Sequence, residues 1–304
     1  MLQPGLLRIS VKGFLMGIAD VIPGISGGTM ALILGIYPRL IVSIRSFDMG
    51  LLKLVRKGQL KESLAHIDAG FLLALCIGIF GALFFFTRLI SLPKLIQTHP
   101  EPIFAFFFGL IVASVAVLIK QLNRLALQDY LLIMIGVVVG WSIVNIVPIE
   151  TPNDTWFISL AGALAICALI LPGISGSFIL LVLNKYVYIL EAIGNLRIEV
   201  IAPFAFGATI GLFTFSRAIS WLLKHHYRQT LTTMIGIIIG SLWVIWPFQN
   251  RVYEMIEGKS RLLDSGPILP TAISTDELVA IILIISGFLT AWYIFHLAMR
   301  PNTR

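Results

Sequence analysis

Residues 22–29, Ile-Pro-Gly-Ile-Ser-Gly-Gly-Thr, interrupt a long apolar segment, and residues 171–177, Leu-Pro-Gly-Ile-Ser-Gly-Ser, interrupt a second one. Proline removes a backbone donor and clashes with the preceding helical turn, while glycine loosens the chain. Each interruption therefore predicts two half-helices joined by an irregular loop. The interrupted segments, 13–46 and 156–190, are both too long for one simple crossing of a bilayer.

The composition of the 304 residues places these loops in a membrane protein. Apolar residues make up 58% of the chain and charged residues 12%, and the mean hydropathy is +0.96. Soluble domains carry about 25% charged residues, so this chain has too little charge to cover a globular surface. A water-soluble protein, a disordered chain and a nucleic-acid binder are therefore excluded. The net charge of +7 comes from Lys and Arg between apolar runs, a pattern that reports membrane orientation.

Six further apolar runs are each long enough for a spanning helix of about 20 residues. We expect these helices near residues 69–92, 102–120, 130–149, 200–223, 229–249 and 277–299. The expected fold is therefore an all-α polytopic membrane protein with two broken segments and six spanning helices.

The two interruptions belong to an internal repeat. The motif Pro-Gly-Ile-Ser-Gly at residue 23 recurs 149 residues later at residue 172. Other equivalent pairs are Gly13 and Gly162, Tyr37 and Tyr186, Arg88 and Arg217, His99 and His226, and Gly109 and Gly236. The chain is therefore interpreted as a tandem duplication, with a first repeat at 1–149 and a second at 150–304. Each repeat holds one broken segment and three spanning helices.

The distribution of Lys and Arg indicates how the broken segments sit in the membrane. If each segment enters and returns as a re-entrant hairpin, one face receives 15 of the 22 Lys and Arg residues. If both segments span, the split is 9 against 13 and shows no bias. The positive-inside rule favours the hairpins, with both termini in the cytoplasm. Three crossings per half then invert the second half relative to the first, as in many secondary transporters.

Two irregular loops that enter from opposite faces should meet near the midplane, buried in protein or lining a wet cavity. The helix that follows each loop presents free N–H groups and the positive end of its dipole, which suit an anion such as phosphate. The candidate substrate-binding residues are Ser26, Gly27, Gly28, Thr29, Ser175, Gly176 and Ser177. The loops themselves are formed by Pro23, Gly24, Pro172 and Gly173.

Three charged residues add to this hypothesis. Arg88 and Arg217 lie near the ends of equivalent apolar helices, and the planar guanidinium suits phosphate. The alternative is that both arginines snorkel to the membrane interface. Asp20 lies among apolar residues in the first half-helix, so it is a candidate to carry a coupling proton or sodium ion. Its alternative is a structural role, capping Ser26 or Thr29 amides or pairing with Lys12.

The remaining polar features suggest no cofactor and no metal site. The histidines at 225–226 have no third ligand nearby in sequence. Residues 47–68 place Lys and Arg among leucines, which predicts a basic amphipathic helix on the cytoplasmic leaflet with anionic membrane lipids as partners. The oligomeric state is left open.

One enzyme pattern is present. Residues 24–28 match the Gly-x-Ser-x-Gly pattern of serine hydrolases, whose soluble form needs a strand before the serine. An intramembrane hydrolase would need His296 close to Ser26. The residues alone thus favour a transporter with an anion-suited centre. A small-anion transporter or channel is the main alternative, and a hydrolase is the third.

Residues 17–31, Gly-x-Ala-Asp-Val-Ile-Pro-Gly-Ile-Ser-Gly-Gly-Thr-Met-Ala, closely resemble the N-terminal signature of a bacterial family formerly catalogued as domain of unknown function 368. Residues 171–177 resemble the second repeat of that family, and the likeness covers essentially the whole chain. The resemblance implies a non-enzymatic flippase for polyprenyl phosphate, specifically undecaprenyl phosphate. It also implies that this carrier lipid of the cell envelope returns from the outer to the inner leaflet of the bacterial cytoplasmic membrane, which recycles it for peptidoglycan precursors.

Overall fold

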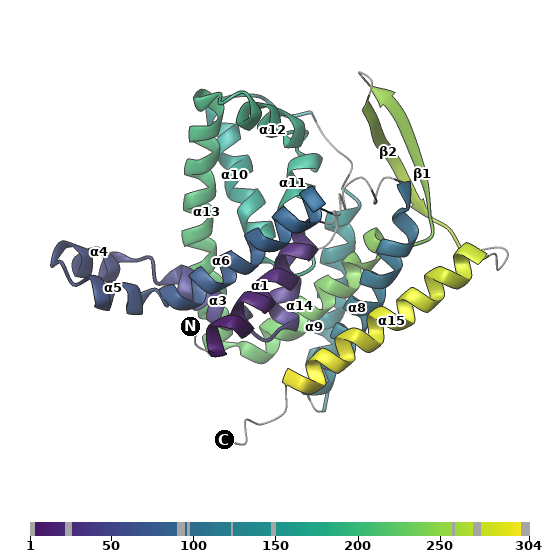
Figure 1. Cartoon of the computed structure of the whole chain (residues 1–304), viewed down its shortest axis with the longest axis horizontal. Coiled ribbons are helices and arrows are strands. Elements are labelled where there is room, and N and C mark those ends of the chain that lie inside the picture. Colours follow the sequence, from purple (N-terminus) through teal and green to yellow (C-terminus); the bar gives the residue numbers. More distant parts are fainter. Residues whose placement is uncertain are drawn as a thin grey trace.

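The computed structural model describes residues 4–21, 26–89, 95, 98–122, 124–146, 150–256, 259–269 and 275–298. Pro23 and Gly24 of the first loop lie outside these ranges. The described chain is a helical bundle with one β-hairpin (Figure 1). The elements are α1 (Pro4–Val21), α2 (Gly27–Ile33), α3 (Tyr37–Arg45), α4 (Met49–Arg56), α5 (Leu60–His66), α6 (Ala69–Phe84), the π-helical turn η1 (Phe85–Leu89), α8 (Pro100–Gln121), α9 (Leu127–Val144), α10 (Thr155–Ile170), α11 (Gly176–Val182), α12 (Tyr186–Gly194), α13 (Ile198–His225), α14 (Tyr227–Ser241), the 3₁₀-helix η2 (Leu242–Ile245), β1 (Gln249–Ile256), β2 (Lys259–Pro267) and α15 (Thr275–Ala298).

Within the described residues, 4 helices are by themselves long and apolar enough to cross a membrane: α8, α9, α13 and α14 continued by η2. The helices expected near 102–120, 130–149 and 200–223 lie at these places. The helix α6 passes the same test only together with α5, from which it bends by 63°. A polytopic membrane protein with mostly helical structure is thus confirmed.

The segment expected as a helix near 229–249 ends early. Helix α14 stops at Ser241, η2 stops at Ile245, and Trp246 takes the extended conformation that a following proline imposes. The chain then forms the antiparallel pair β1–β2, with Gln249 opposite Pro267. The hairpin extends away from the bundle in Figure 1. The β-hairpin at residues 249–267 is thus a local departure from the expected all-α architecture.

Helix packing follows the duplication. Helix α1 packs on α6 and α10 packs on α13, whereas α8 packs on α15 and α14 packs on α9. If the two repeats are exchanged, α10 takes the place of α1, α13 that of α6, α14 that of α8 and α9 that of α15. Each pair of packed helices then coincides with another such pair. The two halves are interleaved, because two of the four pairs join a helix of one half to a helix of the other.

The same equivalence holds at single glycines, where helices approach so closely that a methyl group would meet the backbone of the partner. Small residues permit this approach in membrane helices. The equivalent contacts are Gly13 on Leu75 O and Gly162 on Phe204 O, and likewise Gly109 on Ile284 O and Gly236 on Ile133 O. Each pair of contacts therefore uses corresponding residues of the two halves.

Each broken segment contains a second break that the sequence did not predict. Helices α2 and α11 both have 7 residues, and the following helices α3 and α12 depart from them at 119° and 110°. Gly35 and Asn184, which are equivalent positions, take φ of 68° and 52° at these breaks. A left-handed residue commonly ends a helix. The expectation of two half-helices per segment is therefore wrong, because each segment forms three helices.

The short helices α2 and α11 turn back along the helices before them. Lys12 of α1 donates its Nζ to Leu34 O after α2, at 2.7 Å. Thr151, just before α10, donates its hydroxyl to Leu183 O after α11, at 2.5 Å. A straight helix from residue 12 to residue 34 would separate these groups by about 33 Å. Both broken segments are therefore hairpins in shape.

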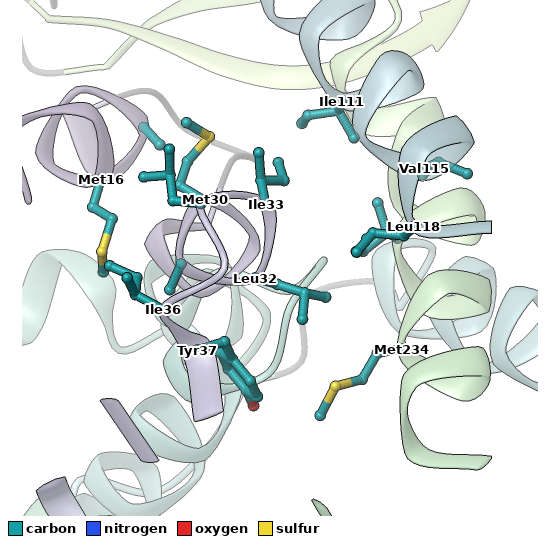
Figure 2. Close-up of a cluster of buried hydrophobic side chains, with 14 of the residues drawn as sticks. Met16, Met30, Leu32, Ile33, Ile36, Tyr37, Ile111, Val115, Leu118 and Met234 are labelled. Carbon is teal, nitrogen blue, oxygen red and sulfur yellow. The ribbon is translucent and has the colours of Figure 1, made fainter. Parts of the chain in front are cut away.

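Helix α2 lies at the centre of the bundle, and all of its residues are buried. Figure 2 shows Met30, Leu32 and Ile33 of α2 between Met16 of α1 and the side chains of α8 and α14. Of the apolar stretches of α8 and α14, 61% is buried, against 17% for α9 and α13. Helices α8 and α14, the second spanning helices of the two repeats, therefore cover one side of α2.

Candidate functional site

The two broken segments contact each other. The amide of Gly173 donates to Oγ1 of Thr29 at 2.7 Å. The hydroxyl of Tyr37 donates to Ile170 O at 3.1 Å. Thr29 is 1% exposed and Tyr37 is fully buried. Thr29 of the first motif thus contacts Gly173 of the second, and Tyr37 of α3 contacts the last residue of α10, whereas a meeting of the two loops at the membrane midplane stays a prediction.

The N-terminus of α2 is already occupied by side chains of the chain itself. Ser26 is the N-cap residue, and its hydroxyl accepts from the amide of Gly28 at 3.2 Å. Asp20 Oδ1 accepts from the amide of Gly27 at 2.8 Å. Residues 26–29 are all buried. This helix end therefore offers an external anion fewer free donors than the sequence suggested, and it places a carboxylate beside them.

Asp20 thus has the capping role that the sequence left open, with a different partner. It binds the Gly27 amide rather than an amide of Ser26 or Thr29, and Lys12 binds Leu34 O instead of Asp20. The Asp20 side chain nevertheless remains exposed. A carboxylate at a helix N-terminus is stabilised by the dipole and by the N–H that it accepts.

The N-terminus of α11 differs from that of α2. Leu169 occupies the position equivalent to Asp20, so no carboxylate is supplied there. Ser175 is the N-cap residue but accepts no capping bond from the helix, and its hydroxyl instead lies 2.7 Å from that of Ser177. Ser175 and Ser177 are partly exposed, whereas Gly176 is buried. The second loop therefore presents the more accessible anion-suited helix end.

The second loop is held in shape by the two residues that the sequence singled out. Gly173 takes φ of +91°, a conformation that side chains disfavour, and its α-carbon faces the backbone of Ile238. Pro172 is fully buried. Both residues therefore support the loop instead of facing a ligand.

Neither arginine reaches the loops among the described residues. Arg217 is exposed, donates Nη1 to Phe213 O at 3.0 Å and lies over the Phe213 ring at 5.8 Å. It therefore extends along its own helix, as the snorkelling alternative describes. Arg88 is exposed and lies in the π-helical turn η1, while Arg217 lies in regular α-helix. π-Helical turns frequently occur at functional sites.

Two cavities border the broken segments. A cavity of about 420 Å³, here called the apolar cavity, lies between α1, α2, α8 and α15 and is lined by residues such as Ile18, Met30 and Phe106. A cavity of about 300 Å³, here called the polar cavity after His226, Gln229, Thr230 and Thr233 in its wall, is otherwise lined by apolar residues: Leu171 of the second loop, Ile219, Leu222, Met234 and Ile237. The polar cavity therefore connects the α13–α14 turn with the second broken segment.

Sequence reasoning missed Tyr37 as a contact between the two segments. Its equivalence with Tyr186 was visible in the repeat, but a buried tyrosine in an apolar run has no distinctive signal. It also missed the polar face of α14, because Gln229, Thr230 and Thr233 lie at the start of a run that is otherwise apolar. Arg228 was likewise missed, and it binds Asp129 Oδ2 at 2.7 Å and carbonyls after α8.

The structure gives no support to a hydrolase. The Ser26 hydroxyl accepts from the Gly28 amide, and Ser26 is 2% exposed. His296 is exposed on α15, and no contact joins it to Ser26 within the described residues. The hydrogen-bonded pair that activates a serine is therefore not formed.

Residues 16–263 match the family described as VCA0040-like, undecaprenyl phosphate translocase-like. This chain belongs to that family. It is 41% identical over 246 residues to the polyprenyl-phosphate transporter of Vibrio cholerae serotype O1, a match that covers 81% of this chain and 79% of the relative. It is 30% identical over 259 residues to the polyprenyl-phosphate transporter of Staphylococcus aureus, with 78% and 85% covered. No solved structure matches the chain. The resemblance seen in the loop motifs is confirmed, and the family and both relatives are named as transporters rather than enzymes.

Proposed function

We propose that this protein is a flippase that moves polyprenyl phosphate, as the undecaprenyl carrier lipid, from the outer to the inner leaflet of the bacterial cytoplasmic membrane. The observation that carries the proposal is the match over most of the chain to two relatives named polyprenyl-phosphate transporters. The contact between Thr29 and Gly173 supports it, because the two family-like motifs form one central site. Such transport would return the carrier for envelope synthesis.

The physical task is to carry a charged headgroup through about 30 Å of hydrocarbon, while the isoprenoid chain stays in an apolar environment. A charge at the bilayer centre is costly unless polar groups replace its water. We assign the headgroup to the N-terminus of α11, where Ser175 and Ser177 are partly exposed. The polar cavity, whose wall includes His226 and Gln229, would then lie between this site and the cytoplasm.

We infer that the two repeats, 1–149 and 150–304, are inverted and that both termini are cytoplasmic. The hairpin shape of both broken segments supports this topology, since it leaves three crossings per repeat. In Figure 1, α12 and the β-hairpin lie at the opposite end of the bundle from the start of α1. Rocking of the repeats about the central contact would give alternating access.

Asp20 is our candidate for ion coupling. It binds the Gly27 amide while remaining exposed, so an ion has access to it. A neutral carboxyl would weaken its hold on this amide and reduce the negative charge next to the site. The substitution Asp20→Asn should then leave lipid binding intact and remove the pH dependence of transport, or its sodium dependence. An unchanged dependence on both ions would exclude Asp20 as the coupling group.

Helices α4 and α5 are our candidate contact with anionic lipids. They project sideways from the bundle in Figure 1, and α4 has no buried residue. Exposed Met49, Leu60 and Leu64 on these helices accompany Lys53 of α4 and Lys57 directly after it. The apolar side chains suit the lipid interface and the lysines suit anionic headgroups.

The transport proposal can be tested in proteoliposomes loaded with undecaprenyl phosphate. A membrane-impermeant phosphatase added outside removes phosphate only from the accessible leaflet. Protein-free vesicles should stop near half conversion, because a charged headgroup crosses the bilayer slowly. Vesicles with this protein should approach complete conversion. The same plateau with and without the protein, at confirmed reconstitution, would refute the proposal.

Arginine roles can be separated in the same assay. Arg88→Ala and Arg217→Ala should be compared, with Arg197→Ala at an outer-face position as the matched control. A slower rate for Arg88→Ala alone would assign the headgroup-collecting role to the arginine of the π-helical turn. Equal rates for all three variants would show that Arg88 and Arg217 only snorkel.

A further inference from the structure

The apolar cavity begins within one helical turn of the central contact. Met30 lines it and follows Thr29, whose hydroxyl binds Gly173. Ile18 lines it from α1, two residues before Asp20. Its volume of about 420 Å³ falls within the range of ligand pockets, about 300–1,000 Å³. The apolar cavity therefore lies beside the helix that joins the two motifs.

The lining of this cavity is hydrocarbon in character. Its described lining residues are apolar except for Thr290, whose hydroxyl donates to Ser286 O within α15 at 2.8 Å. The aromatic rings of Phe86, Phe106 and Phe107 contribute to the wall. A polar or hydrated ligand would find no partner here, so the chemistry admits only an apolar chain.

Comparison of the repeats shows that this character is specific to one half. The face of α8 that lines the apolar cavity is equivalent to the face of α14 that lines the polar cavity, at an offset of 127 residues between Gly109 and Gly236. The equivalent pairs are Pro102 and Gln229, Ile103 and Thr230, Phe106 and Thr233, Phe107 and Met234, and Leu110 and Ile237. Three of these five positions are apolar on α8 and polar on α14. The duplicated surface has therefore diverged: every one of the five residues is apolar on α8, whereas α14 carries polar residues at three of these positions.

We propose that the apolar cavity binds the isoprene units nearest the phosphate of a polyprenyl phosphate. This assignment rests on the proposed function. A polyprenyl phosphate carries one chain on its headgroup, whereas a phospholipid carries two. Hydrocarbon around the protein is as apolar as the cavity, so van der Waals packing provides the gain. The cavity therefore selects chain shape and fixes the position of the headgroup.

The test compares two single-chain monophosphates, farnesyl phosphate with methyl branches and hexadecyl phosphate without them. Their retention by the purified protein is measured by native mass spectrometry, against phosphatidylglycerol and undecaprenyl phosphate. The wild type should retain farnesyl phosphate about tenfold better than hexadecyl phosphate, since packing differences of this size discriminate apolar groups. Phe106→Thr, which copies the residue of the polar repeat, should abolish this preference. Ala291→Phe should do the same by filling the cavity, since Ala291 is 2% exposed and lines it.

The matched control is Phe206→Thr on α13, where the ring is 64% exposed and lies outside the apolar cavity. It should keep the preference of the wild type. Thermal unfolding of each variant separates lost selectivity from lost folding, and Phe106→Thr makes the test independent of overpacking by Ala291→Phe.

The possible results distinguish the two proposals. A folded Phe106→Thr variant with unchanged preference overturns the cavity assignment alone, provided that the wild type retains undecaprenyl phosphate over phosphatidylglycerol. If the variants lose retention of phosphatidylglycerol but not of farnesyl phosphate, the cavity binds phospholipid chains, and the assignment to isoprene units is overturned. If the wild type retains neither farnesyl phosphate nor undecaprenyl phosphate, the proposed function is overturned as well.

Discussion

Replacing Thr29 with valine removes one acceptor at the centre of the molecule with almost no change in side-chain shape. The Thr29 hydroxyl accepts from the Gly173 amide at 2.7 Å, and Thr29 is 1% exposed. In the variant this amide loses its partner. An unsatisfied buried amide costs about 1–3 kcal/mol, and Gly173 is only half-buried, so we expect about 1 kcal/mol.

This loss acts on the contact between the two broken segments. A change of about 1 kcal/mol alters a conformational equilibrium about fivefold. Joined segments should therefore become about fivefold less favoured in Thr29→Val relative to separated ones. Hydrogen exchange measured by mass spectrometry on a peptide covering residues 171–177 reports this change, and we expect faster exchange at Gly173.

Two controls define the result. Thr29→Ser keeps the hydroxyl and should exchange as the wild type does. Thr209→Val removes an exposed hydroxyl that binds Ala205 O within α13, and it should leave residues 171–177 unchanged. Exchange at Gly173 that is equally slow in Thr29→Val and in wild type would refute the reasoning, because the bond would then contribute nothing to joining the segments.

Three further predictions concern packing and charge. Tyr37→Phe removes the bond to Ile170 O and should lower stability by about 0.5–1.5 kcal/mol in thermal or denaturant unfolding; a gain in stability would contradict it. Gly207→Ala places a methyl group against Ser159 O and should cost about 1–3 kcal/mol, whereas Gly194→Ala, with open space around it, should not destabilise; equal effects would argue against close packing of α10 and α13. Hydrogen bonds from the Leu51 amide and then from His66 hold the pKa of Asp48 below its ordinary value of 3.8. The ionised cap therefore stabilises α4 above that pH and is lost as the pH falls through the lowered pKa, so Asp48→Ala should speed hydrogen exchange in residues 49–56 at neutral pH but not in acid.

Sequence alone was sufficient for the class of the protein and for the places of its two repeated motifs. Low charge and long apolar runs leave no soluble alternative, because too few charged residues remain to cover a surface in water. In hydrocarbon the apolar runs must be helical, because only then are their backbone groups bonded internally. The recurrence of Pro-Gly-Ile-Ser-Gly located both broken segments, because proline and glycine disrupt helices through local geometry. These are local effects, and a linear sequence records them directly.

The sequence did not reveal the second break in each segment or the β-hairpin. Gly35 follows α2 in a left-handed conformation, but the equivalent residue after α11 is Asn184, so no residue type common to both repeats marks the second break. Pro247 follows η2 and prevents the helix from continuing. Pairing between β1 and β2 then decides the conformation of both strands, and a hydropathy count does not reveal such pairing.

The different surroundings of the two loop motifs were decided by tertiary structure. In the sequence, residues 26–29 and 175–177 are nearly identical loop motifs and suggest equal half-sites. In the structure, Asp20 folds back onto Gly27 and fills one of them, while Leu169 leaves the other without a carboxylate. Likewise, α8 and α14 are both apolar runs until packing shows which face of each lines a cavity. Local propensity sets where helices break, but the partner of each buried polar group depends on contacts between residues more than a hundred positions apart.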